Sequence, residues 1–386
     1  MFDREHRDTS YISKMWYDMY LENRDPFPLN LTPQLTWCQH ENPAHNEPCT
    51  RAADIIVSAV RFHRSLEAGV LNPDVFSLKP KTYDNPWLKR GISLLPEAVS
   101  FYAAYAVDSY PLDMSQYARL FSSTRVPQQG KDKLVSHSGS RHIVVMRGSK
   151  LYKLPVMDDH FQPYSAERIE SALRGIMADS AGSQDGPAVG ALTGAERNSW
   201  ARTRATMETS PVNAASLAEV DSALFVLTMD DASPESHEAI AETMLYGPAT
   251  NRWFDKCFNI IVCQNGRAGI AWEHAWGDGV AVLNFFNEVF KEISATPSRA
   301  QAGPDSSTWS ELSWDLSLPS VRQDIADATE YSRKVISEVD LDVYQTESMT
   351  KKHVKDSNHS PDGLMQMVLQ RAHWKLFNEM PVTYGT

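Results

Sequence analysis

The sequence predicts an α/β protein, because strands and amphipathic helices both occur along its 386 residues. Residues 257–263 and 268–272 are two largely apolar runs separated by QNGR at 264–267, with Asn265 and Gly266 at its centre. This pattern is typical of two strands joined by a two-residue turn with φ > 0. After Gly279 apolar residues recur at helical spacing, which predicts a helix with one buried face: Val282, Phe285, Phe286, Val289 and Ile293.

Two further helices are expected near the start of the chain, at residues 11–20 and 51–71. The second carries four apolar residues on one face: Ile55, Ala59, Phe62 and Leu66. Residues 26–48, between these helices, have the composition of a loop.

Two segments resemble linkers, at residues 180–190 and 296–307. The second has two prolines and no apolar run, so it is the better domain boundary. We therefore expect an N-terminal domain at residues 1–308 and the beginning of a second domain at residues 309–386.

Composition limits the classes of function. With 42% hydrophobic residues the chain can bury a substantial core, and a formal net charge of -12 argues against a nucleic-acid partner. The four cysteines show no C-x-x-C pairing, which predicts reduced thiols and neither a zinc site nor a disulfide framework. The charged N-terminus lacks the apolar core of a signal peptide, so the chain is cytosolic or its targeting segment is absent.

Residues 272–279, WEHAWGDG, hold the strongest candidate site. His274 follows the predicted strand and stands four residues before Asp278, at the start of the predicted helix. An imidazole there can serve as a general base while the carboxylate fixes the loop, and the apolar flanks predict an enclosed position. A histidine between two tryptophans also fits a hydrogen-bonded core side chain.

Residues 87–110 are rich in aromatic and aliphatic side chains, but charges interrupt them. Their uncharged runs are shorter than the roughly 20 residues that span a bilayer. Basic residues at one end and tyrosines at the other suit a helix lying in the plane of the headgroups, and a buried amphipathic helix explains the same pattern.

Several motifs in order resemble the carnitine/choline acyltransferase family. They are YPLDMSQY at 110–117, STRVP at 123–127, NRWFDK at 251–256 and EHAWGDG at 273–279. The similarity is strongest to the members of the inner mitochondrial membrane that use long-chain substrates. The resemblance implies a location on the matrix side and a membrane-contact insertion at residues 85–110.

The resemblance implies a chloramphenicol-acetyltransferase-like α/β fold, with a mixed sheet flanked by helices in each of two related domains. Acyl-CoA and carnitine enter a tunnel between the domains from opposite sides, and no cofactor or metal is used. His274 matches the catalytic histidine, and Asp278 matches an acidic residue that supports the loop. A histidine with an ordinary pKa of about 6.5 is mostly neutral near neutral pH and can take the carnitine hydroxyl proton.

The same resemblance implies the substrate-binding residues. Lys351 and Lys355, with Ser360 and Asp362, match a segment along the CoA path, where the lysines meet phosphates as point charges. A solvated surface loop explains these lysines as well. On the carnitine side the matching residues are Tyr20, Tyr384 and Thr386.

Family members continue past the residue matched by Tyr384 and begin earlier, so the chain resembles a fragment whose second domain is truncated. We expect little transferase turnover from it alone, since the resemblance places an oxyanion donor and an arginine beyond its end. A non-catalytic short form that binds membranes or acyl-CoA is the alternative. Transfer of the acyl group to another acceptor, such as choline, is a weaker alternative.

Overall fold

The computed structural model describes residues 12–26, 32–79, 85–181, 186–296, 299–305 and 308–382. The chain forms two compact units, Met1–Asp340 and Leu341–Thr386. The first unit includes residues that follow the boundary expected at 308, because β11 (Ser310–Glu311) joins its sheet and α12 (Pro319–Ser337) packs on it. The two-domain assignment at that boundary stays a prediction.

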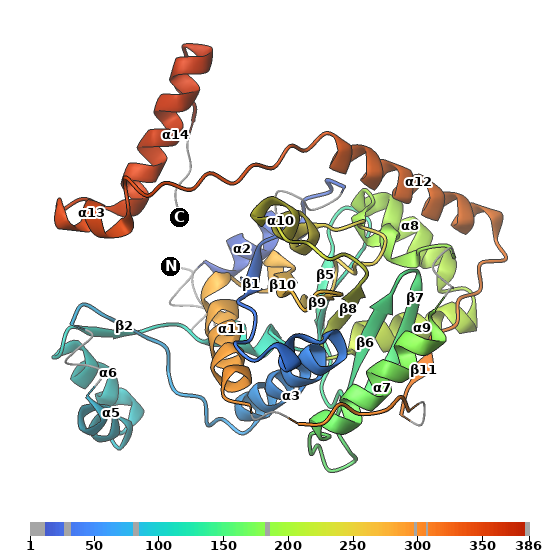
Figure 1. Ribbon diagram of the computed structural model, residues 1–386, viewed down its shortest axis with the longest axis horizontal. Coiled ribbons are helices and arrows are strands. Elements are labelled where there is room, and N and C mark those ends of the chain that lie inside the picture. Colours follow the sequence, from blue (N-terminus) through green and yellow to red (C-terminus); the bar gives the residue numbers. More distant parts are fainter. Residues whose placement is uncertain are drawn as a thin grey trace. The chain divides into compact units, whose positions relative to one another are not determined.

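A seven-stranded mixed sheet forms the centre of the first unit (Figure 1). Two neighbouring pairs, β9–β8 and β8–β6, are parallel, and the other pairs are antiparallel. The strand order is β1 (Gln34–Trp37), β10 (Ala268–Trp272), β9 (Phe258–Cys263), β8 (Val226–Asp230), β6 (His142–Arg147), β7 (Lys150–Pro155) and β11. The predicted mixed sheet is therefore confirmed.

Helices cover both faces of this sheet, as expected. One face packs against α3 (Pro48–Glu67), α7 (Ala166–Asp179) and α11 (Gly279–Ser294). The other packs against η3 (Val189–Gly194), α8 (Arg197–Met207), α9 (Pro211–Ser222), α10 (His237–Leu245) and α12. In β6, Ile143 and Val145 face the first group while Val144 and Met146 face the second, which is the period of two that a strand imposes.

The hairpin of β9 and β10 has the predicted strands but a different turn. Gly266 N donates to the Cys263 carbonyl at 2.9 Å, and Cys263 N donates to the Arg267 carbonyl at 2.8 Å. Within this described turn only Gly266 has a positive φ, +75°, so the loop has three residues and the expected two-residue geometry was wrong. The Asn265 side chain stabilises this form, since it accepts from Arg267 N and donates to the Pro234 carbonyl.

The predicted helices are confirmed as α2 (Ser13–Leu21), α3 and α11, and Val282, Phe285, Val289 and Ile293 are buried. The expected loop at 26–48 instead contains β1 and a short 3₁₀ helix, η1 (Pro43–Asn46). Trp37 of β1 is fully buried and stacks on Phe286 with ring centroids 4.5 Å apart. Four residues are too few for a clear alternation, so pairing with β10 decides this strand.

The second predicted linker packs closely against the first unit in its described part, 299–305. Arg299 forms ion pairs with the buried carboxylates of Asp54 and Glu170. The backbone N–H of Ala302 also donates to Glu170, and that of Asp305 donates to the Ser171 carbonyl. The other predicted linker leads directly into the buried helix η3.

Two small ribbons and two short helices complete the first unit. β4 (Ser123–Val126) pairs with β5 (Lys133–Ser136), close to η2 (Ser115–Arg119) in the chain. β2 (Val75–Ser77) pairs with β3 (Ser109–Pro111), and between them lie α5 (Pro86–Ser93) and α6 (Glu97–Tyr105). The described helices include none that is both long and apolar enough to cross a bilayer.

The second unit contains α13 (Lys351–Asp356) and α14 (Pro361–Phe377), and the described residues of α14 include no buried one.

Candidate active site

His274 lies where β10 ends, as the first residue of the short 3₁₀ helix η4 (His274–Trp276). The two residues that follow it, Ala275 and Trp276, are fully buried. The indole of Trp276 donates to the Cys257 carbonyl at 2.8 Å. The backbone that follows His274 is therefore firmly held, and the imidazole is partly exposed, with 22% of the side chain accessible.

The imidazole contacts two aromatic residues of α2. Tyr20 Oη lies 2.8 Å from Nδ1 of His274, and the Trp16 ring meets the imidazole edge-on at 5.3 Å. Trp16 Nε1 also donates to the Ala275 carbonyl at 3.1 Å. Residues 16 and 20 share a helix face because they are four positions apart, so α2 covers the site with both rings.

Asp278 is the N-cap of α11, where its Oδ1 accepts from Gly279 N at 2.7 Å. The same oxygen lies 3.4 Å from Nε2 of His274. The backbone N–H of Asp278 donates to Gln116 of η2 at 2.9 Å. A carboxylate at this position is favourable because the N-terminus of a helix attracts negative charge.

Burial lowers the pKa of His274 below its ordinary value, and the contact with Asp278 opposes this shift. The neutral ring, with one nitrogen able to accept a proton, is therefore the main form at neutral pH. When the ring takes up a proton, both nitrogens become donors, and Tyr20 Oη and Asp278 Oδ1 can accept from them. The lowered pKa and the two neighbouring acceptors suit His274 to a role as a base that takes up a proton and then releases it.

Glu273, just before the histidine, was not predicted as a site residue. Its carboxylate is buried, and Oε2 accepts from Ala275 N at 2.9 Å, which caps η4. Burial raises the pKa of Glu273, and the guanidinium of Arg125, 3.1 Å from Oε1, opposes that shift. Arg125 stands in the STRVP motif, and no spacing in the sequence connects that motif to Glu273.

The NRWFDK segment at 251–256 is a buried structural cluster. Arg252 pairs with Asp230, and Asp255 accepts from Arg197 at 2.6 Å and from the Trp200 indole at 2.8 Å. Lys256 is completely buried, and burial lowers its pKa to about 8.

The structure brings together Tyr20, His274 and Asp278 in the first unit. The residues expected along the CoA path belong to the second unit, where Lys351 and Lys355 are exposed on α13. There Ser360 is the N-cap of α14 and Asp362 lies in its first turn. Tyr384 and Thr386 lie outside the described residues.

The chain was compared with protein families, curated proteins and solved structures. The family profile described as Choline/Carnitine o-acyltransferase matches residues 1–386. Two relatives are each 38% identical to this chain, over 99% of its length and 58% of their own. They are the proteins named carnitine O-palmitoyltransferase 2, mitochondrial, from Rattus norvegicus and from Homo sapiens. Choline O-acetyltransferase of Mus musculus is 25% identical over 100% of this chain and 58% of its own. A chloramphenicol acetyltransferase structure covers 74% of this chain and 96% of its own, with a TM-score of 0.28 and 12% identity.

Proposed function

Because the chain belongs to the choline/carnitine O-acyltransferase family, we propose that it serves carnitine O-acyl transfer, in which a long-chain acyl group moves between CoA and carnitine. The chain spans 58% of the length of the carnitine O-palmitoyltransferase 2 relatives that it matches. The observation that carries the proposal is the position of His274, whose two ring nitrogens lie between Tyr20 Oη and the carboxylate of Asp278.

In the proposed reaction His274 takes the proton of the carnitine hydroxyl as its oxygen attacks the thioester carbonyl. The carbon–sulfur bond then breaks, and the imidazolium returns the proton to the departing CoA thiolate. A lowered pKa supports this role, because it keeps the base neutral before the reaction and makes the imidazolium a ready acid afterwards. No metal or cofactor takes part in the proposed steps.

Carnitine and acyl-CoA are the proposed substrates. We assign Tyr20, Tyr384 and Thr386 to carnitine by resemblance, and the contact between Tyr20 and His274 supports a carnitine site beside the base. Four residues of the second unit are assigned to CoA in the same way: Lys351, Lys355, Ser360 and Asp362. The exposure of the two lysines is compatible with contact to phosphates.

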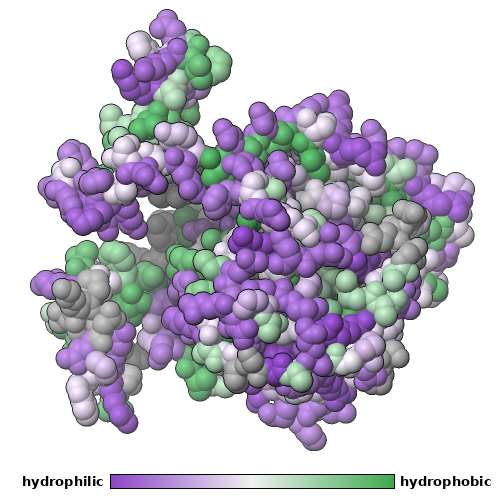
Figure 2. Space-filling model, viewed as in Figure 1, coloured by the Kyte–Doolittle hydropathy of each residue, from purple (hydrophilic) through white to green (hydrophobic). Residues whose placement is uncertain are grey.

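We further propose peripheral contact with the matrix side of the mitochondrial inner membrane through residues 85–110. Large apolar side chains of α5, α6 and the loop between them are exposed, among them Trp87 at 80%, Leu94 at 81% and Tyr102 at 71%. Figure 2 shows apolar surface on this part of the molecule. Exposed apolar side chains near basic residues favour the interfacial interpretation over the buried one.

The release of CoA from palmitoyl-CoA, with and without carnitine, tests the proposed function. Two preparations should be assayed, the chain alone and a chimaera in which it replaces the aligned segment of the rat relative. We expect carnitine-dependent release from the chimaera that His274→Ala abolishes. A folded chimaera that binds palmitoyl-CoA without carnitine-dependent release, or one whose release survives His274→Ala, would contradict the proposal.

A further inference from the structure

Arg125 of β4 makes contacts that no motif of the sequence assigned. Its side chain is buried, and its three nitrogens donate to three different segments of the chain. Nε donates to Asp132 Oδ2 at 2.8 Å, Nη1 to Glu273 Oε1 at 3.1 Å, and Nη2 to the carbonyl of Tyr20 at 2.8 Å. One guanidinium thus joins the end of α2 to the residue that precedes His274.

The contact with Tyr20 holds the end of α2. The last four carbonyls of a helix have no partner within the helix, and the carbonyl of Tyr20 is one of these. Arg125 Nη2 satisfies it, and also donates to the Asn23 carbonyl at 3.2 Å. Arg125 therefore fixes the residue whose hydroxyl contacts His274.

The contact with Glu273 holds the histidine's own backbone. Glu273 can cap η4 through Oε2 while Oε1 accepts from Arg125. A buried carboxylate without a cation would tend to take up a proton, and it would then be a poorer acceptor for the Ala275 N–H. Arg125 opposes this proton uptake and so favours the ionised cap.

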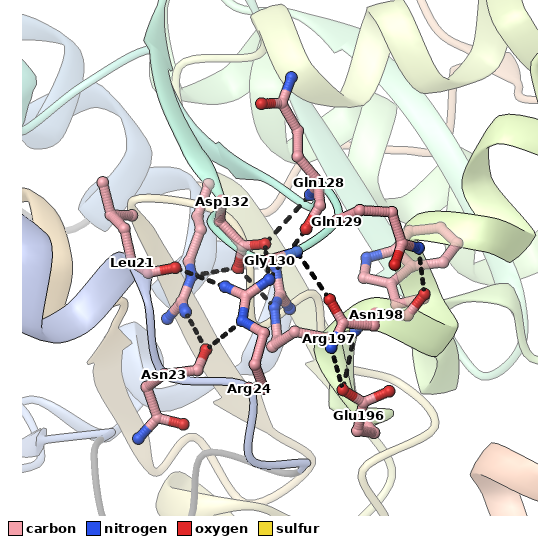
Figure 3. Close-up of polar contacts among 12 residues, drawn as sticks. Leu21, Asn23, Arg24, Gln128, Gln129, Gly130, Asp132, Glu196, Arg197 and Asn198 are labelled. Atoms are coloured by element: carbon pink, nitrogen blue, oxygen red, sulfur yellow. Dashed lines mark hydrogen bonds and ion pairs between the residues drawn. The ribbon is translucent and has the colours of Figure 1, made fainter.

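Asp132 keeps Arg125 in place and is itself surrounded by arginines. Figure 3 shows Arg24 and Arg197 reaching Asp132, at 2.9 Å and 2.7 Å respectively. Arg24 also donates to the Leu21 carbonyl, and Asp132 N donates to the same carbonyl at 2.9 Å. Because the carboxylate of Asp132 is completely buried, it orients Arg125 without competition from solvent.

We propose that Arg125 is a positioning residue for His274, acting on it through the carbonyl of Tyr20 and the carboxylate of Glu273. This inference rests on the proposed function, which makes His274 the base. A lysine in place of Arg125 would keep the charge. Its single ammonium group cannot donate to Asp132, Glu273 and Tyr20 together, as the planar guanidinium does. In the variant, α2 and η4 should separate more often, so that the imidazole becomes more accessible.

The test measures the rate at which diethyl pyrocarbonate modifies individual histidines of the folded chain, by peptide mass spectrometry. At about pH 7.5 the imidazole of His274, whose pKa is lowered by burial, is mostly neutral, so its rate reports accessibility. We expect Arg125→Lys to speed modification of His274 roughly tenfold, the size expected from losing one charge-assisted hydrogen bond. His45 and His142, buried elsewhere, should keep their rates.

Arg204→Lys is the matched control, because Arg204 is equally buried and pairs with Asp221 and Glu208 away from the site. It should leave the rate at His274 unchanged. If Arg125→Lys does not fold, Glu273→Gln tests the same link with less disturbance, and should also speed modification of His274.

An unchanged rate at His274 in the folded variants, or equal acceleration at His45 and His142, would overturn the proposal. Because the experiment needs no turnover, its failure is distinct from failure of the proposed acyl transfer.

Discussion

Tyr20 and His274 are 254 positions apart in the sequence, yet the hydroxyl of one lies 2.8 Å from Nδ1 of the other. The contact joins α2, near the start of the chain, to the end of β10. It gives the imidazole a defined partner on the side opposite Asp278. A catalytic histidine benefits from such a partner, because the contact fixes the orientation of the ring and favours one tautomer.

Tyr20→Phe should lower kcat/KM for carnitine by about fivefold in the chimaera, because it removes one hydrogen bond worth roughly 1 kcal/mol and keeps the ring. Steady-state assays with varied carnitine measure this. Tyr17→Phe, on the same helix, is the control and should have little effect. Equal kcat/KM values in the Tyr20 variant and the wild type would contradict a role for the hydroxyl.

Asp278→Asn should move the acid limb of the pH–rate profile to lower pH. Asp278 raises the pKa of His274 against the effect of burial, so removing its charge lets that pKa fall further. The base then stays neutral at more acidic pH. Asparagine caps a helix as well as aspartate does, so α11 should be retained. A limb that stays in place or moves to higher pH would show that Asp278 does not act electrostatically on His274.

Gly266→Ala should destabilise the fold more than Gly130→Ala. Both glycines have a positive φ, +75° and +79°, so alanine costs roughly 1–2 kcal/mol at either position. At Gly266 a Cβ would also lie 1.9 Å from the Asn46 carbonyl oxygen, whereas at Gly130 nothing lies within 4 Å. Urea unfolding of the two variants gives the comparison. Similar free energies of unfolding would mean that the backbone around Asn46 moves away from the added Cβ at little cost in free energy.

Lys256→Met should change how stability depends on pH. Burial lowers the folded-state pKa of Lys256 to about 8, so above that pH the unfolded state binds more protons there than the folded state. The wild type therefore gains stability relative to the variant as pH rises from about 8 toward the ordinary lysine value, by at most about 1.4 kcal/mol per pH unit. Urea unfolding at several pH values measures the difference, and a constant difference would contradict the lowered pKa.

Trp87→Ser should weaken binding to vesicles of phosphatidylcholine and an anionic phospholipid roughly tenfold, because burying a large apolar side chain contributes about 1.5–3 kcal/mol. Flotation assays measure the bound fraction. Val212→Ser, at an exposed valine of α9, is the control and should leave binding unchanged. Equal binding by the two variants would argue against contact through residues 85–110.

The long periodic elements of the fold were predictable from the sequence, and the short ones were not. The apolar face of α11 repeats from Val282 to Ile293, and β9 is apolar apart from Asn259, so local pattern sufficed. The four residues of β1 depend on pairing with β10, and the turn before β10 depends on the Asn265 side chain and on the close approach of Asn46. Strand β10, the Pro234 carbonyl that Asn265 binds and Asn46 each lie far in the sequence from the short element that they help to shape.

The candidate site shows the same division. His274 and Asp278 are four residues apart, and their proximity follows from a strand leading into a helix. Tyr20 was reached through the family resemblance. Trp16, Glu273 and Arg125 lie around the histidine because α2, β4 and β10 meet there, and no spacing rule connects residues so distant in the chain.

The excursion from Val75 to Pro111 begins and ends at one point of the first unit. The Leu112 N–H donates to the Asp74 carbonyl at 2.8 Å, so the two ends are already joined. Asp74 is in turn held by the hydroxyl of Tyr117 and by Asn284 of α11. A short turn could therefore replace these residues without rerouting the chain around them. We therefore expect that exchanging this segment would leave the arrangement around His274 in place.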